Sequence, residues 1–351
     1  MTDHVISSQS LKLSGAVALA LAMGVAASSQ AAVIIPKKGG FSGHVNIGAG
    51  GVAVESNMLA SIVSGKVNVG EKEIDNLSDS PDSSEGGAIP VLNFELSYTF
   101  ASTRTQIHIG NLLEDLLRFD TSTVAGVRQD IGNAGLVGAS VETTSIDTQV
   151  WSDPYLTNSK RSDTDRTAKG FQVYWQQFMS SGLEMRFTAK EIDIDKERSG
   201  ESLALSESQR QLLDRNGDTD RFDLFYEFSS DDKHHIVTPG LSYVDNSLDG
   251  DAMGNDGGVA SLNYIYQHND RWRYVFNGSY GDFDSNEANP IYATEDSFEH
   301  YGISATVFYS QPFGLKYWAF NATAGWFEED HDIDFYDNNA GIVTFGMFRK
   351  F

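Results

Sequence analysis

The chain ends in the stretch AGIVTFGMFRKF, residues 340–351. Its apolar set is Val343, Phe345, Met347 and Phe351, and its intervening set is Thr344, Gly346 and Lys350. This period of two predicts a β-strand with one apolar and one polar face, and only Arg349 departs from the pattern. A strand at the end of a chain leaves an open edge unless another strand pairs with it. The segment therefore favours a sheet that closes on itself.

The same pattern recurs as pairs of alternating runs joined by very short turns, as in consecutive hairpins. After a first strand at 41–49, the predicted pairs are 90–100 with 103–110, 122–131 with 135–150, 168–179 with 183–195, 219–229 with 234–246, 258–268 with 272–282 and 298–309 with 315–327, and 340–351 closes the set. The connections between pairs are longer and polar, among them 55–88, 111–120 and 196–218. We expect 55–88 to be an exposed loop. The count gives about 14 strands, with 12 and 16 as alternatives.

Aromatic residues distinguish the two folds that give such alternation, a soluble sandwich and a water-filled barrel. They gather beside the proposed short turns and comprise Tyr98, Phe100, Trp175, Phe178, Phe228, Tyr266, Trp272, Tyr274, Tyr309, Phe313, Tyr317 and Trp318. A ring of this kind at one interface is typical of membrane barrels. The sequence therefore predicts an all-β fold, a transmembrane antiparallel up-and-down β-barrel.

The N-terminal residues 1–31 have the features of a secretory signal peptide. Lys12 precedes the apolar block GAVALALAMGVAA (residues 15–27), and small residues at 29–31 follow it. The block is shorter than the ~20 residues that a membrane-spanning helix needs. We assign residues 32–351 to one barrel domain and expect no spanning helix in it.

Together, the signal peptide, the hairpin series and terminal Phe351 resemble Gram-negative outer-membrane barrels over the whole mature chain. The GFSG start (40–43) and the FGMFRKF end (345–351) also resemble a proteobacterial barrel-like family of unknown function, which supplies no activity and no site. The resemblance implies a cell outer-membrane location, with lipid, lipopolysaccharide and the assembly machinery as partners. It also implies that Phe351 is an assembly signal. Short turns and an even strand number place both termini in the periplasm.

Composition excludes several functional classes. The chain has no Cys and a net charge of −24. No Cys means no disulfide, metal thiolate or Cys nucleophile, and the acidic balance argues against nucleic acid as a partner. The His residues are isolated, apart from His234 and His235 at a turn, and form no catalytic motif. We therefore expect no enzyme activity and no cofactor, with calcium as the one possible exception.

Charged residues of both signs fall on the polar faces of the predicted strands. The lumen-lining candidates are Glu95, Arg128, Glu142, Glu184, Arg186, Lys190, Arg221, Asp223, Glu227 and Arg273. They would form a selectivity lining or, as an alternative, pair between strands and support the sheet. If Lys190 faces Asp223, the same register places Arg186 opposite Glu227.

These patterns favour a passive channel or a substrate-specific porin for small hydrophilic solutes. One alternative is a non-conducting barrel anchor whose acidic outer loops bind cations, lipopolysaccharide or a partner, and a barrel enzyme is a more distant one. A lumen rich in paired charge would favour the anchor, whereas a continuous unpaired polar path would favour the channel.

The 196–218 loop and the residues after it contain two further features. Leucines among polar residues from 201 to 215 allow a short helix. The oxygen-bearing residues Asp214, Asn216, Asp218 and Asp220 resemble the opening of a calcium loop, although Thr219 and Phe225 stand where its glycine and glutamate belong. A second acidic cluster comprises Glu328, Glu329, Asp330, Asp332 and Asp334. We predict weak calcium binding or, as the simpler alternative, solvated acidic loops.

Overall fold

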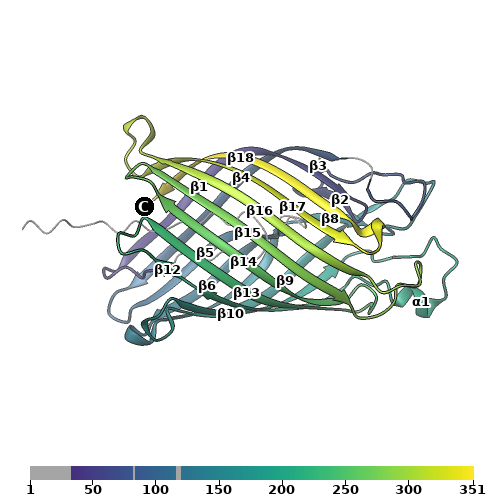
Figure 1. Ribbon diagram of the computed structural model, residues 1–351, viewed down its shortest axis with the longest axis horizontal. Coiled ribbons are helices and arrows are strands. Elements are labelled where there is room, and N and C mark those ends of the chain that lie inside the picture. The colour runs from purple at the N-terminus through teal and green to yellow at the C-terminus, as the bar shows by residue number, and fades with distance from the viewer. Residues whose placement is uncertain (1–32, 82–83, 116–119) are drawn as a thin grey trace, which may run out of the picture.

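The computed structural model is a barrel of tilted strands (Figure 1). It describes residues 33–81, 84–115 and 120–351, with only the backbone of residues 112–115 and 120. The predicted signal peptide, 1–31, lies outside the described residues. We call the end that carries the C-terminus and the short turns the turn end, and the opposite end, where α1 (Glu207–Gln211) lies, the loop end.

Fourteen antiparallel strands form the closed wall, as the sequence predicted. In order around the wall they are β1 (Gly40–Ser56), β4 (Glu85–Phe100), β5 (Thr105–Asp115), β6 (Asp120–Asp130), β7 (Leu136–Ile146), β9 (Asp163–Gln176), β10 (Leu183–Ile194), β11 (Gly217–Tyr226), β13 (His235–Leu248), β14 (Asn255–Gln267), β15 (Trp272–Ser285), β16 (Ser297–Ser310), β17 (Trp318–His331) and β18 (Asn338–Lys350). β1 pairs with β4 on one side and β18 on the other, which closes the sheet. Four short strands complete the set: β2 (Leu59–Ile62), β3 (Val67–Asn68), β8 (Thr148–Trp151) and β12 (Phe228–Ser229).

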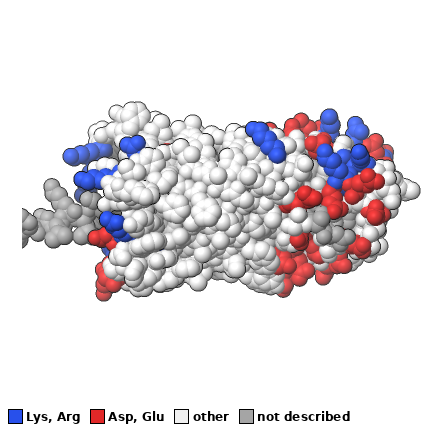
Figure 2. All heavy atoms as spheres, turned by 90° about the horizontal axis from the view of Figure 1, so that it is seen from above, with Lys and Arg blue, Asp and Glu red and all other residues white. Residues whose placement is uncertain are grey.

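The two faces of the wall differ in chemistry and exposure. On β11, outward Phe222 is 47 % exposed and inward Asp223 only 2 %. Large apolar side chains are exposed on the outer face of most wall strands, far beyond the patches that a soluble monomer leaves in water. Figure 2 shows a broad uncharged band on the face in view, between two ends that carry the charged residues. This arrangement is that of a barrel embedded in lipid.

Aromatic rings border the apolar band at both ends. Neighbouring aromatic side chains are in contact in the predicted ring at the turn end. Trp175 and Phe178, for example, make an edge-to-face contact with ring centroids 4.7 Å apart. The sequence analysis missed a second ring at the loop end, which comprises Tyr243, Tyr280, Tyr301 and Trp326. Its hydroxyls donate hydrogen bonds to carboxylates, as from Tyr280 to Glu299 over 2.9 Å. Phenols held between apolar and charged surroundings are typical of a membrane interface.

The prediction of an exposed loop at 55–88 was wrong. β1 extends to Ser56, β4 begins at Glu85, and β2 and β3 form a hairpin between them. Leu59, Ile62, Val67 and Val69 of this segment are buried. The short apolar runs of this segment, at 58–60 and 62–63, gave no sustained period, and their burial comes from contacts with distant strands. The predicted 111–120 connection is also shorter, because β5 and β6 extend into it.

Short helix α1 confirms that the 196–218 loop has some helical structure. Ser206 caps it by accepting from the Gln209 N–H, and the Gln209 side chain accepts from the Ser206 N–H in return. No helix in the described ranges is long and apolar enough to cross a membrane.

The apolar band predicts a position-dependent cost of charge on one strand. Leu262 lies on the outer face near the middle of β14, and Asp256 lies on the same face near the loop end. We expect Leu262→Arg to lower the free energy of unfolding in lipid vesicles by about 2–4 kcal/mol, and the control Asp256→Arg to change it by about 0–1 kcal/mol. Urea unfolding followed by Trp fluorescence measures both. Equal costs at the two positions would contradict the membrane placement.

Candidate functional site: the charged lumen and the folded cap

One group of lumen charges lies on β4, β5 and β6. Arg128 is almost fully buried and its Nη2 donates to Glu95 Oε1 over 2.5 Å. The Arg128 Nε–H donates to Gln106 over 2.6 Å, and Ser97 donates to the same Glu95 oxygen over 2.7 Å. The guanidinium therefore spans β5 to reach a carboxylate two strands away, and each of its partners is held by another hydrogen bond.

A second group lies on β9, β10 and β11. Arg186 Nη2 donates to Glu184 Oε1 over 2.6 Å, and Gln176 donates to the other oxygen over 3.1 Å. On the next strand, Asp223 Oδ1 accepts from Arg221 Nε over 2.7 Å and from Ser242 over 2.6 Å. Arg186 also lies over the buried ring of Phe225. These contacts place two acid–base pairs side by side on the lumen face.

Lys190 and Glu142 form a third pair across an intervening strand, with Nζ 3.4 Å from Oε1. Both residues are aligned with Gly170 of β9, one from each side. A Cβ on Gly170 would lie 2.9 Å from Lys190 Cγ, so glycine leaves the room in which the lysine crosses the strand. The three groups form one continuous charged array over β4–β11.

Two predicted lining residues lie outside the array. Arg273 faces the lumen on β15, on another part of the wall, and its Nε–H donates to Gln267 over 2.6 Å. Glu227 is half-buried between β11 and β12, where its N–H donates to Gly182 over 2.9 Å. The predicted register was wrong: β10 and β11 are neighbours, but Arg186 faces Asp223 and Lys190 faces Thr219. A shift of the register by four residues leaves every side chain on the same face of the sheet. The alternation of apolar and polar residues therefore could not determine the register.

The wall from β13 to β18 also carries Arg273 on β15 and the buried neighbours His300 and Glu329, but most of its polar groups at mid-height are neutral. The neutral groups bond across the strands, as between Asn263 and Asn277 (2.6 Å), and between Thr306 and Thr323 (2.8 Å). Asn321 donates over 2.7 Å to Asn46 of β1, across β18. Sequence reasoning singled out charged residues only and missed this amide and hydroxyl layer. The lumen thus has one side with an array of paired charges and one side on which neutral polar groups predominate at mid-height. On that second side, apolar clusters lie toward the turn end and toward the loop end.

Apolar side chains fill the lumen toward the loop end. The first cluster joins inward residues of the wall to the β2–β3 hairpin and comprises Val52, Val54, Leu59, Ile62, Val67, Val69, Val150, Ile194, Phe327, Ala340 and Ile342. The hairpin is fixed by pairing between β2 and β8 and by a 2.7 Å hydrogen bond from Ser61 to Gln149. The polar lumen therefore ends below an apolar layer.

Above that layer the long loops form a second apolar cluster, which we call the cap. Its buried members are Ile74, Tyr155, Leu213, Ile333, Phe335 and Tyr336, drawn from four connections. Tyr155 and Tyr336 share a 2.6 Å hydrogen bond between hydroxyls, and Asn289 donates to the Tyr336 hydroxyl over 2.7 Å. Burial raises the pKa of both phenols, so they stay protonated and neutral.

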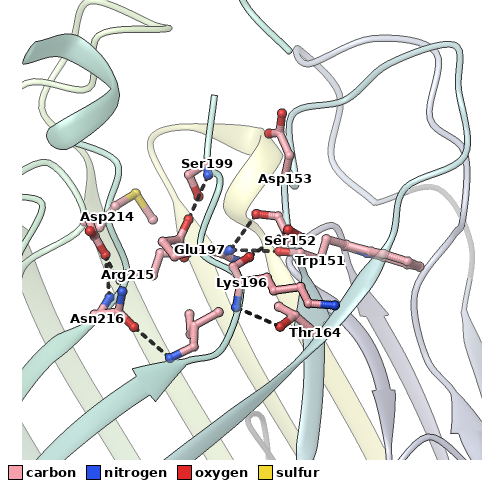
Figure 3. Close-up of polar contacts among 12 residues, drawn as sticks. Trp151, Ser152, Asp153, Thr164, Lys196, Glu197, Ser199, Asp214, Arg215 and Asn216 are labelled. Carbon is pink, nitrogen blue, oxygen red and sulfur yellow. Dashed lines mark hydrogen bonds and ion pairs between the residues drawn. The ribbon is translucent and has the colours of Figure 1, made fainter. Parts of the chain in front are cut away.

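Two buried arginines fasten the loops of the cap. Arg161 donates to the carbonyls of Asn57 (2.8 Å), Pro154 and Glu71, and its guanidinium lies over Trp151. Burial lowers its pKa to about 10, so it remains charged at neutral pH. Arg215 joins Glu197 (2.8 Å) to the Trp151 carbonyl (2.8 Å), as Figure 3 shows. Arg161 binds backbone carbonyls from separate loops, and Arg215 joins the Glu197 side chain to the end of β8, so the loop end is a folded unit.

Of the four calcium candidates, Asp214 and Asn216 precede β11, and Asp218 and Asp220 lie in its first residues. Asp214 accepts from the Asn216 N–H over 3.0 Å, and Asn216 in turn accepts from the Ile194 N–H at the end of β10 (Figure 3). Asp218 and Asp220 are exposed on the outer face of the strand. Over the ranges that the structure describes, no three His, Asp or Glu side chains gather as a metal site.

Phe351, the predicted assembly signal, takes part in closure of the sheet. Its N–H donates to Gly43 O and its carbonyl accepts from the Gly43 N–H, both over 3.0 Å. The ring itself is 53 % exposed at the turn end. The last residue of the chain therefore extends the β1–β18 seam by one exchanged pair.

The closed wall, the lipid-facing band and the two aromatic rings define an outer-membrane β-barrel protein. The family described as "Protein of unknown function (DUF2860)" matches residues 40–349, and the chain belongs to it. A search of curated proteins finds no match.

Solved barrels of similar architecture are distant in sequence. The outer membrane channel DcaP of Acinetobacter baumannii has 12 % identity and a TM-score of 0.42, with 89 % of this chain and 97 % of that chain covered. OmpTdeltaL8, a loop deletion mutant of an outer membrane protein of Vibrio cholerae, has 9 % identity and a TM-score of 0.40 over 89 % and 99 %. An anion-selective porin from Comamonas acidovorans has 8 % identity and a TM-score of 0.39 over 90 % and 100 %.

The arginine contacts predict that the cap can unfold without the barrel. Arg161→Ala leaves several buried carbonyls without a donor, which destabilises the cap by a few kcal/mol. We expect chymotrypsin to cleave the loops at least about tenfold faster, because local opening governs cleavage of a folded segment. The control is Lys160→Ala, at the exposed neighbouring position. The change of gel migration on heating reports whether the barrel itself is folded. Unchanged cleavage in Arg161→Ala, or loss of that change in migration, would contradict a cap that unfolds independently of the barrel.

Proposed function

We propose that the protein is a narrow outer-membrane channel for small hydrophilic solutes, with its loop end outside the cell. One observation carries the proposal: a belt of polar side chains lines the inner face at mid-height, between apolar clusters toward the two ends of the wall. The array on β4–β11 supplies both signs of charge, and the β13–β18 wall supplies amides and hydroxyls. Such a surface solvates a polar solute and rejects an apolar one.

The lumen is restricted in the structure. Each cation of the array has a carboxylate oxygen within 3.4 Å. Such pairing favours the non-conducting anchor, so the proposal of a channel depends on the polar belt around the wall and not on the charges alone. The apolar layer and the cap stand between the array and the loop end. We therefore expect low or intermittent conductance, which rises when the cap is loosened, because solute passage requires the loops to move.

Ion selectivity tests whether the array lines a conducting path. Arg128→Gln leaves the Glu95 carboxylate in excess and should shift the reversal potential in a KCl gradient toward cation preference. Glu95→Gln should shift it toward anion preference, and the double variant should return near the parent value. Asp231→Asn, an exposed residue in a turn at the turn end, is the control. Absence of conductance from both the parent and Arg161→Ala would refute the channel.

A second candidate function rests on the outer rim, where carboxylates face one another across consecutive strands. Asp245 is opposite Asp220 on one side and Asp256 on the other, and Asp256 is opposite Asp284. On the next strands Glu299 is opposite both Asp282 and Asp330. Like charges in directly opposed positions destabilise a sheet unless a counter-ion neutralises them. Divalent cations bound here would bridge the rim to lipopolysaccharide phosphates.

Calcium titration distinguishes this rim from acidity in general. We expect millimolar calcium to raise the thermal unfolding temperature of the refolded barrel, with a Kd of about 0.1–1 mM. The double variant Asp245→Asn/Asp256→Asn should lose most of the rise. The control Asp231→Asn/Asp270→Asn removes the same charge at the turn end and should keep it. An equal rise in both double variants would refute a specific rim site.

A further inference from the structure

Among the described residues, the longest break in the hydrogen-bonded ladder of the wall lies between β4 and β5. β4 pairs with β1 from Glu85 to Thr99, but it pairs with β5 only from Glu95 to Phe100. In the described part of the chain, no strand pairs with the β5-side edge of β4 between Glu85 and Phe94. β5 continues to Asp115, paired with β6 alone. The two strands therefore separate toward the loop end.

The break lies within the height of the apolar band. A strand tilted by about 40° rises roughly 2.5 Å per residue, so a band of about 25 Å takes about ten residues. Counted from Phe100 in the turn-end ring, those residues extend to Pro90. Pairing with β5 stops about halfway, at Glu95. An unpaired strand edge in lipid is costly, since hydrocarbon offers no hydrogen bonds.

Two residues end the ladder in an ordered way. The Asn111 side chain takes the place of a strand backbone, because it accepts from the Phe94 N–H over 2.8 Å and donates to the Leu92 carbonyl over 2.7 Å. Asn93 donates to the Asn111 carbonyl over 2.9 Å. The next residue on this edge is Pro90, which has no N–H to satisfy. The separation is thus encoded in the sequence.

Both sides of the break are apolar. On the outer face Leu92 is 56 % exposed and Ala88 and Pro90 are exposed as well. On the lumen face Ile89 and Val91 pack against the apolar cluster beneath the cap. The β2–β3 hairpin closes the break from inside: a Cβ on Gly87 of β4 would lie 3.2 Å from Val67 Cγ1 of β3. A path across the wall here meets apolar side chains on both faces, apart from the amides of Asn93 and Asn111 at the end of the ladder.

We infer that this break is a side portal through which a molecule with an apolar chain passes between the outer leaflet and the barrel interior. The β2–β3 hairpin is its movable closure. The side chains of β4 are uncharged from Gly86 to Phe94, which suits an apolar chain better than an ion. This route is separate from the polar lumen path and does not depend on conductance through it.

Cysteine labelling from the lipid phase tests the portal, and the absence of native Cys leaves one reactive site in each variant. The probe is N-(1-pyrenyl)maleimide dissolved in the vesicle lipid. We expect Val91→Cys, on the lumen face at the break, to react at least roughly tenfold faster than Thr306→Cys, since reaction follows access. Thr306 is the matched control: it faces the lumen on β16, which is paired on both sides. Leu92→Cys, on the outer face, sets the maximum rate.

Two results would overturn the portal. One is equal labelling of Val91→Cys and Thr306→Cys by the lipid-dissolved probe. The other is faster labelling of Val91→Cys by a sulfonated, water-soluble maleimide than by the pyrenyl probe, which would mean access through the aqueous lumen. If Val91→Cys fails the heat-modifiability check for folding, Ile89→Cys on the same face gives the same comparison.

Discussion

A sheet in hydrocarbon must satisfy the hydrogen bonds of every strand edge, because lipid supplies none. The first and last strands of this chain meet that demand by pairing along β1 and β18, and the exchange between Gly43 and Phe351 extends the seam to the final residue. Closure then fixes the faces, since strict alternation sends every second side chain to lipid and the others to the interior. The placement of charge follows from closure: acids and bases lie inside or at the rims.

Burial explains why the interior charges occur in pairs but not why they occur at all. A buried ion pair contributes little net stability, since desolvation offsets the attraction, whereas loss of one partner costs about 3–5 kcal/mol. Neutral side chains would support the wall as well, as the Asn and Thr layer on β14–β17 shows. The array on β4–β11 also uses contacts across an intervening strand, such as Lys190 to Glu142 over Gly170. Charges retained at that cost are more consistent with solute selection than with support of the sheet.

The sequence predicted those properties that depend on alternation, namely fourteen strands and their approximate positions. It failed where an outcome depends on contacts between distant segments. A four-residue shift between β10 and β11 preserves every face, so Arg186 opposite Asp223 could not be distinguished from Arg186 opposite Glu227. The segment 55–88 was predicted to be exposed because it is polar and acidic, with the run SDSPDSSEGG (78–87) near its end. The burial of its Leu59, Ile62 and Val67 depends on Val150, Phe327 and Ile342, far away in the chain.

The β2–β3 hairpin contacts both the cap and the break in the ladder between β4 and β5. It joins the cap to the wall, because Arg161 binds the carbonyls of Asn57 and Glu71 on either side of it. It also covers the one stretch where β4 has no partner on its β5 side. A wall strand can lack a partner in lipid only if another element shields its edge, so the hairpin compensates for the break that Asn111 and Pro90 create. Movement of the cap would therefore displace this shield, and opening of the loop end and of the side portal would be coupled through one element.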